Sequence, residues 1–160
     1  MSRLLCHQAA MQEPAPENNF QQAHAMLIIK SFQHTVGRPI LPVATAEILY
    51  HTPQIILSHN TQDDPVLTYG NLAAQTLWQR PWAELTQLPS RLTAEPAHRT
   101  QRADMFDKMR KFGFFENYTG IRISATGQRF EIHNATIWTL TDAQGKRRGE
   151  AATFTEFTPL

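Results

Sequence analysis

The sequence predicts an α+β fold, in which a five-stranded antiparallel sheet carries helices on one face and further helices precede it. Two observations support this fold class. Helical and strand-like segments follow one another as two helices, two strands, three helices and three strands. The strand-like segments are joined by short turns rich in Gly, Asn and Asp, which favour antiparallel neighbours. At 160 residues, the chain is expected to form one domain.

The first part of the chain predicts a tail followed by helices. Residues 1–17 contain Pro14 and Pro16 among polar residues, and we expect a mobile tail there. Apolar residues then recur at helical spacing through 18–36, and Gly37 ends that helix. A second short helix is expected over 44–50. Residues 18–52 are therefore assigned to an N-terminal helical extension, and residues 53–160 to the core.

The core alternates short strands and helices. Strands are expected over 54–60 and 65–71, followed by a helix over 72–78 that Asn71 can cap. Pro81 suits the first turn of a short helix, and a longer helix is expected over 96–112, before Gly113. Three strands complete the chain, over 115–124, 129–139 and 149–157.

The register of the 115–139 hairpin decides which residues share a face of the sheet. A two-residue turn at Thr126-Gly127 would place Ile121 opposite Ile132 and Tyr118 opposite Ala135. It would also pair Arg122 with Glu131 on the other face. The first face is then apolar near the turn and polar at its far end, where Asn117, Thr119, Asn134 and Thr136 lie. These polar groups either line a ligand pocket or bond to neighbouring loops.

Four stretches resemble one family: LSHNTQDDPVLTYGN, PWAELTQLPSRLTAEP, YTGIRISATGQRFEIHNATIWTL and GEAATF. Together they resemble the MEKHLA domain, a PAS-related module that occurs in small stand-alone bacterial proteins and at the C-termini of plant homeodomain–leucine zipper factors. The resemblance covers roughly residues 20–157 and implies a PAS-like fold with a role in sensing or regulation. It implies no defined ligand and no catalytic set, and fold analogy alone is weak support for function.

Composition narrows the partners and the location that we expect. The net charge is +1, from 15 basic and 14 acidic residues, which gives no reason to expect a nucleic-acid partner. The start lacks the apolar region of a secretory signal, and no apolar segment is long enough to span a bilayer. We therefore expect a cytoplasmic protein without a membrane partner.

The PAS resemblance raises flavin and haem as cofactors. A flavin photosensor of the LOV type needs a cysteine beside the flavin, and Cys6, the single cysteine, lies in the expected tail. Flavin bound without an adduct stays open. Haem-binding PAS domains often use a histidine on the long helix, where His98 and Arg102 could reach the mouth of the pocket. The seven histidines show no metal-ligand spacing, and no motif of a hydrolase or a phosphate loop is present, so no enzyme is expected.

Two functions remain open. The first is a sensory module that binds a small molecule and signals through a separate effector protein or a homodimer. Its pocket would be lined by Tyr69, Met105, Met109, Asn117, Thr119, Ile121, Ile132, Asn134, Thr136 and Trp138.

The second is an interaction or dimerisation module whose cavity is filled by side chains. Its working surface would be the outer face of the sheet, with Tyr118, His133, Ile137 and Phe154, and the helix from Phe20 to Phe32 would cover that face within the chain or across a dimer.

Overall fold

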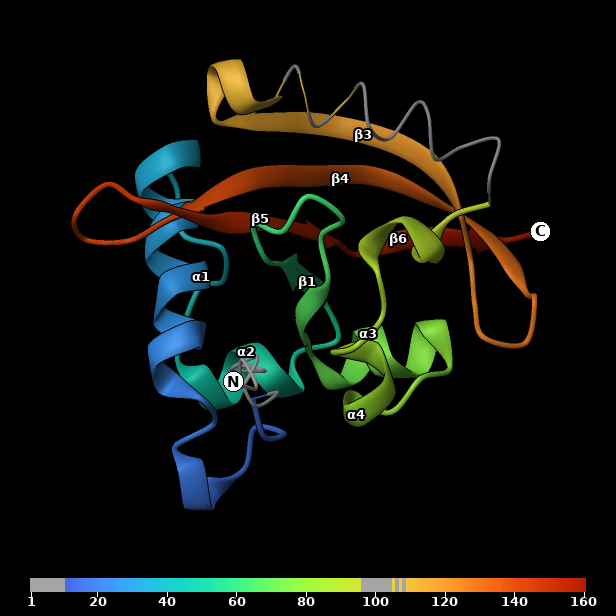
Figure 1. Cartoon of the computed structure of the whole chain (residues 1–160), viewed down its shortest axis with the longest axis horizontal. Coiled ribbons are helices and arrows are strands. Elements are labelled where there is room, and N and C mark those ends of the chain that lie inside the picture. Colours follow the sequence, from blue (N-terminus) through green and yellow to red (C-terminus); the bar gives the residue numbers. More distant parts are fainter. Residues whose placement is uncertain (1–10, 96–104, 106, 108) are drawn as a thin grey trace, which may run out of the picture.

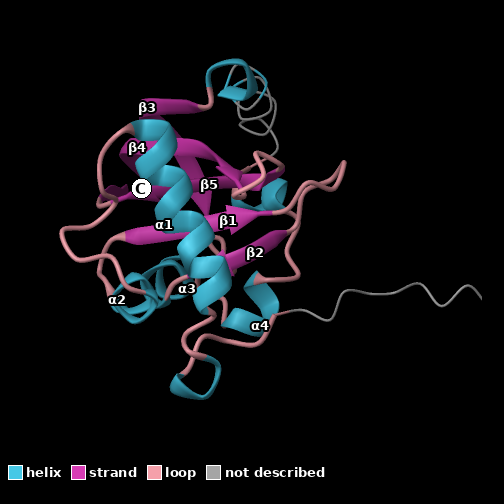
Figure 2. Ribbon diagram, turned by 90° about the vertical axis from the view of Figure 1, so that its left-hand side faces the viewer, coloured by secondary structure: helices cyan, strands magenta, loops and turns pink. Residues whose placement is uncertain are grey.

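The computed structural model describes residues 11–95, 105, 107 and 109–160 and confirms the α+β architecture. Its sheet is antiparallel, with strand order β2-β1-β5-β4-β3 (Figure 1 and Figure 2), and β6 pairs with β4. The strands are β1 (Ile55–His59), β2 (Leu67–Gly70), β3 (Phe114–Ile123), β4 (Arg129–Thr141), β5 (Arg147–Phe154) and β6 (Glu156–Pro159). The strand expected over 149–157 is divided in two at Thr155, and both parts pair with β4.

The helices of the described part are η1 (Pro16–Asn18), α1 (Gln22–Val36), α2 (Ala46–His51), α3 (Leu72–Trp78), α4 (Trp82–Leu85) and η2 (Ser90–Thr93). Helix α1 begins later than predicted because Asn19, Phe20 and Gln21 are left-handed, with φ of 52–53°. Asn71 caps α3 as predicted: its Oδ1 accepts a hydrogen bond from the Ala74 N–H. Most of the helix predicted over 96–112 lies outside the described residues, which show a helical end at 109–112 before Gly113.

Two hydrophobic cores lie on the two faces of the sheet. Helix α1 packs across β4 on one face of the sheet (Figure 2). Ile28 and Phe32 of this helix share a core with Trp138 and Leu140. The rings of Phe32 and Trp138 meet edge to face, with centroids 4.9 Å apart. The predicted cover by this helix therefore forms within the chain. On the opposite face, α3 and η2 close over a second core, which contains Trp78.

The predicted hairpin register is wrong near the turn. The turn has three loop residues, because the Ser124 N–H bonds to the Gln128 carbonyl and Gly127 takes φ of 83°. The observed pairs are Gly120 with Ile132 and Arg122 with Phe130, one residue away from the prediction. A one-residue change moves every side chain to the other face. Arg122 and Ile121 therefore exchange faces relative to the prediction.

Two bulges change the register farther along the hairpin, so that the predicted pairing holds at Tyr118 and is lost again at Phe115, which pairs with Ile137. The register shifts on each side of Tyr118, which pairs with Ala135 as expected. Each bulge contains a left-handed asparagine, Asn117 at φ 58° in β3 and Asn134 at φ 52° in β4. Because of the bulge at Asn134, the residues of β4 that face the cavity have even numbers before it and odd numbers after it. Ala135 and Ile137 then share a core with Ile132.

The N-terminal stretch differs from the predicted tail. Residues 1–10 lie outside the described part, but residues 11–17 pack against the domain. The Trp82 indole N–H donates to the Met11 carbonyl at 2.7 Å, and the Tyr50 hydroxyl donates to Glu13 at 2.5 Å. Among the described residues, no helix is both long and apolar enough to cross a bilayer.

Candidate ligand-binding site

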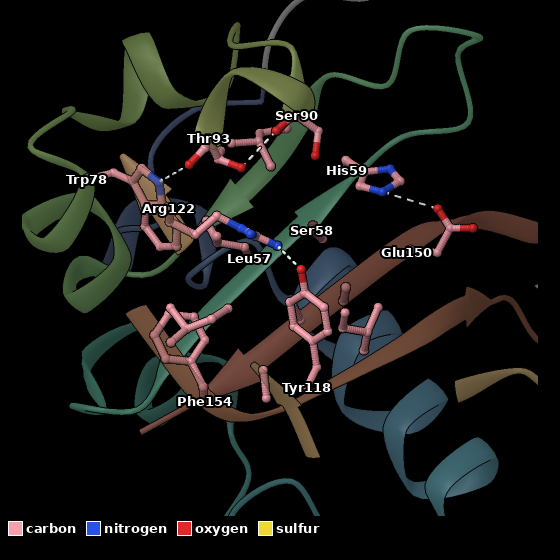
Figure 3. Close-up of a pocket in the computed structure, with 16 residues that line it drawn as sticks. Leu57, Ser58, His59, Trp78, Ser90, Thr93, Tyr118, Arg122, Glu150 and Phe154 are labelled. Atoms are coloured by element: carbon pink, nitrogen blue, oxygen red, sulfur yellow. Dashed lines mark hydrogen bonds and ion pairs between the residues drawn. The ribbon is translucent and has the colours of Figure 1, made fainter. Parts of the chain in front are cut away.

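A small cavity lies between the inner face of the sheet and the α3–η2 segment (Figure 3). Its volume is about 50 Å³. Strands β1, β3, β4 and β5 supply most of its wall, and β2, α3 and η2 supply the rest. Its apolar lining includes Leu57, Trp78, Ile132, Ile137 and Phe154, and its polar lining includes His59, Ser90, Thr93, Tyr118, Arg122 and Glu150.

Arg122 is the central polar group of this wall. Arg122 is only 5% exposed, and one of its guanidinium nitrogens donates to the Tyr118 hydroxyl at 3.0 Å. Another donates to the Ile121 carbonyl at 2.8 Å, and the guanidinium carbon lies 5.3 Å from the centre of the Tyr118 ring. No carboxylate of the described residues lies within 4 Å of this guanidinium. Its charge therefore has no ionic partner there.

Gly120 makes room for the contact between Arg122 and Tyr118. These three residues alternate along β3, so their side chains share one face of the sheet. A Cβ atom at position 120 would lie 2.6 Å from the Tyr118 hydroxyl and 3.0 Å from an Arg122 nitrogen. Glycine is the one residue that lets the phenol and the guanidinium close over the backbone at this position.

A second polar group, the His59–Glu150 pair, occupies another part of the cavity wall. The His59 Nε2 lies 3.1 Å from Glu150 Oε2, as an ion-pair contact without hydrogen-bond alignment. These side chains are 6% and 1% exposed. Glu150 Oε1 accepts from Arg147 Nε at 3.0 Å, and Arg110 Nε lies 3.8 Å away. The charge of Glu150 is thus compensated by its neighbours, whereas that of Arg122 is not.

The hydroxyl and indole groups over the cavity are bonded to the backbone of η2. The Trp78 indole N–H donates to the Thr93 carbonyl at 3.4 Å, and the Thr93 hydroxyl donates to the Ser90 carbonyl at 2.8 Å. These bonds hold the η2 segment against α3. The segment therefore forms a defined roof rather than an open rim.

The structure separates the ten residues predicted to line a pocket. Ile132 lines the cavity, and Met105 and Met109 belong to the core around it without lining it. Tyr69, Thr136 and Trp138 are buried on the α1 side of the sheet or its margin, and Ile121 shares the face of Glu131. Asn117, Thr119 and Asn134 are exposed, and the Asn134 amide donates to Glu156. His98 and Arg102, predicted at the pocket mouth, lie outside the described residues.

The polar patch predicted at the far end of the hairpin is therefore not a pocket wall. The prediction assumed regular strands, whereas Asn117 and Asn134 are the bulge residues themselves. Tyr118, Ile137 and Phe154, predicted on the outer face, line the cavity instead. Sequence reasoning missed Arg122 because the assumed register paired it with Glu131. The available signal was the spacing Tyr-x-Gly-x-Arg, with a small residue between two large ones on one strand face.

The cavity and its lining do not fit a flavin or a haem, the two cofactors that the PAS resemblance raised. Pockets for drug-sized ligands and cofactors measure about 300–1,000 Å³, well above the 50 Å³ found here. Large aromatic side chains, Trp78, Tyr118 and Phe154, line this small space. The described residues contain no cluster of three or more metal-ligating side chains.

Comparison with solved structures gives the fold. The PAS domain of a protein from Colwellia psychrerythraea superposes with a TM-score of 0.60 at 10% identity, over 72% of this chain and 92% of that one. The light-state dimer of the fungal blue-light photoreceptor Vivid gives 0.57 at 16% identity, over 80% and 93%. A light-oxygen-voltage domain studied with a flavin analogue gives 0.57 at 14% identity, over 72% and 83%.

Comparison of sequences gives the family. No protein of curated function matches the chain. The MEKHLA domain family matches residues 22–159, which run from the first residue of α1 to the end of β6. The match thus includes the helix on one face of the sheet and every described element that encloses the cavity on the other. The chain belongs to the MEKHLA domain family and has the PAS fold.

Proposed function

We propose that this chain is a regulatory module that senses a small molecule in the cavity between the sheet and the α3–η2 segment. The observation that carries the proposal is Arg122, a buried cation on the cavity wall without a carboxylate partner in the described part of the chain. A buried charge without a partner is costly. A ligand that binds there offsets that cost, whereas a purely structural wall needs no such group.

The sheet provides a route from the cavity to the opposite surface. Along β4, Ile137 lines the cavity and the next residue, Trp138, packs under α1. Along β5, the neighbouring Ala151 lies in the α1 core, and Ala152 lines the cavity. Any movement of these strands on ligand binding changes the surface on which α1 packs. We propose that α1 passes the signal to a separate effector protein or to a second copy of the chain in the cytoplasm.

The alternative is an interaction module without a ligand, and the small cavity volume favours it. A cavity of about 50 Å³ is large enough for ordered water. Phe112 is 76% exposed and Phe157 is 41% exposed, so apolar side chains are available for a partner. In this case α1 is a fixed cover and the cavity has no regulatory role.

A cavity-filling variant separates the two functions. Ala152→Val adds bulk to the cavity wall, and Thr119→Val adds a similar side chain at an exposed position of β3. Native mass spectrometry of the full-length protein and thermal shifts against a metabolite panel are measured for each protein. The sensory function predicts ligand-dependent shifts in the native protein and in Thr119→Val that are lost in Ala152→Val. A ligand-free mass and flat melting temperatures across the panel would leave only the interaction module.

A further inference from the structure

We propose that the cavity binds a small monocarboxylate through Arg122. This inference rests on the proposed sensory function and gives its ligand a chemical class. A guanidinium carries five N–H donors in a planar fork that matches a carboxylate. Two of its nitrogens bond to the Tyr118 hydroxyl and the Ile121 carbonyl, and neither acceptor carries a full charge. The fork therefore keeps donors for an anion.

The burial of Arg122 indicates that the ligand carries a negative charge. At 5% exposure, Arg122 is shielded from bulk water, and the described residues offer it no counter-ion. Its contact with the Tyr118 ring supplies partial compensation by a cation–π interaction. An anionic ligand supplies the missing charge and accepts the remaining N–H groups. Charge-assisted hydrogen bonds of this kind are about twice as strong as neutral ones.

The rest of the cavity limits the ligand to one charge and a short body. Glu150 lines the same cavity and already pairs with Arg147 and His59, so these two groups are engaged and do not favour a second carboxylate on the ligand. Ile132 and Phe154 offer apolar contacts to a short carbon chain. A volume of about 50 Å³ is far below the roughly 300–1,000 Å³ of pockets for drug-sized ligands, so we expect a ligand of only a few non-hydrogen atoms. Acetate and pyruvate are suitable probes, and acetamide is a neutral probe of matching shape.

The test combines thermal shift with isothermal titration calorimetry on the full-length protein at constant ionic strength. Sodium acetate and sodium pyruvate are compared with acetamide, succinate and sodium chloride. The expected result is a melting temperature that rises with acetate or pyruvate concentration, with no rise for acetamide and a weaker rise for succinate. Arg122→Met, which keeps bulk and removes charge, is expected to abolish the rise. Arg122→Lys, which keeps charge without the fork, is expected to weaken binding about tenfold.

The remaining outcomes separate this inference from the function on which it rests. An equal response of Arg122→Met and the native protein to acetate would overturn it, since the anion would then bind elsewhere. A response to acetamide as large as that to acetate would overturn the carboxylate class and leave a ligand-binding cavity. No response to any probe, with Ala152→Val indistinguishable from the native protein across the metabolite panel, would overturn both. Should Arg122→Met fail to fold, the carboxylate response of Arg122→Lys decides, because a response equal to that of the native protein refutes the role of the fork.

Discussion

Asn71→Asp is expected to destabilise the domain strongly, although the two side chains have nearly the same shape. Asn71 is fully buried, and its Oδ1 accepts from the N–H groups of Ile56 and Ala74 at 3.2 and 3.1 Å. Its amide nitrogen donates to the Gln54 and Leu49 carbonyls at 2.7 and 3.1 Å. A carboxylate keeps both accepted bonds but cannot donate. Two buried carbonyls then lose their donor and face a negative charge.

The magnitude follows from those two donated bonds. Each costs about 1–3 kcal/mol when its buried partner is left unpaired, so we expect a loss of about 3–5 kcal/mol at neutral pH. For a domain of this size, that corresponds to a melting temperature lower by about 6–20 °C. Burial raises the pKa of the introduced carboxyl group above its value in the unfolded chain. The loss should therefore shrink as pH falls from 7 toward about 4, and it should stay constant below that value, where both states carry the neutral acid.

Urea unfolding at pH 7 and pH 4, followed by circular dichroism, measures this effect. Asn117→Asp is the matched control, because Asn117 is exposed and its left-handed backbone also suits aspartate. The control should change the free energy of unfolding by less than about 0.5 kcal/mol. A loss below 1 kcal/mol for Asn71→Asp at pH 7 would refute the view that this amide joins α2, β1 and α3.

Three further predictions concern pH and backbone geometry. Burial lowers the pKa of His24 from 6.5 to about 4, so the unfolded chain binds a proton before the folded one does. Stability should fall by up to about 3 kcal/mol as pH drops from 6.5 to 4, and His24→Gln should flatten that part of a pH series of urea midpoints. Gly149→Ala should cost about 2–5 kcal/mol, because its Cβ would lie 1.8 Å from the His59 carbonyl oxygen at φ 143°. Gly145→Ala, at φ 80° in open space, should cost only about 1 kcal/mol, and equal losses would contradict the steric explanation. At Asn134, Gly should be tolerated and Val should cost about 1–3 kcal/mol, because φ is 52° there; equal melting temperatures would argue against backbone strain.

The order of the elements could be predicted from the sequence because each has a local signal. Helix α3 occupies the predicted residues 72–78, since Asn71 supplies its cap and the apolar residues have helical spacing. The ends of β3 lie one residue from the prediction, because turn residues and Gly113 mark them. The start of α1 was missed because three left-handed residues precede it without a glycine.

The candidate site could not be predicted in the same way because it depends on long-range register. One additional loop residue in the turn at 125–127 reversed the inward-facing residues of β3 near the turn. Asn134 carried a local signal for a bulge, since asparagine is depleted in strands and adopts left-handed φ more often than most residues, but the prediction assigned it to a pocket wall instead. Arg122 was therefore assigned a partner across the strands and was not considered as a pocket group.

The two asparagine bulges have a consequence for comparing this chain with its structural neighbours. Each bulge inserts one residue into one strand, so it acts on an alignment as a single gap. An alignment that runs through β4 without that gap would equate the cavity residue Ala135 with a position on the opposite face in a relative without the bulge. If ligand specificity were then inferred from the aligned positions, the comparison would use residues that lie under α1 and not residues that line the cavity. Columns in this region should be assigned from superposed strands, with the gap placed at Asn134.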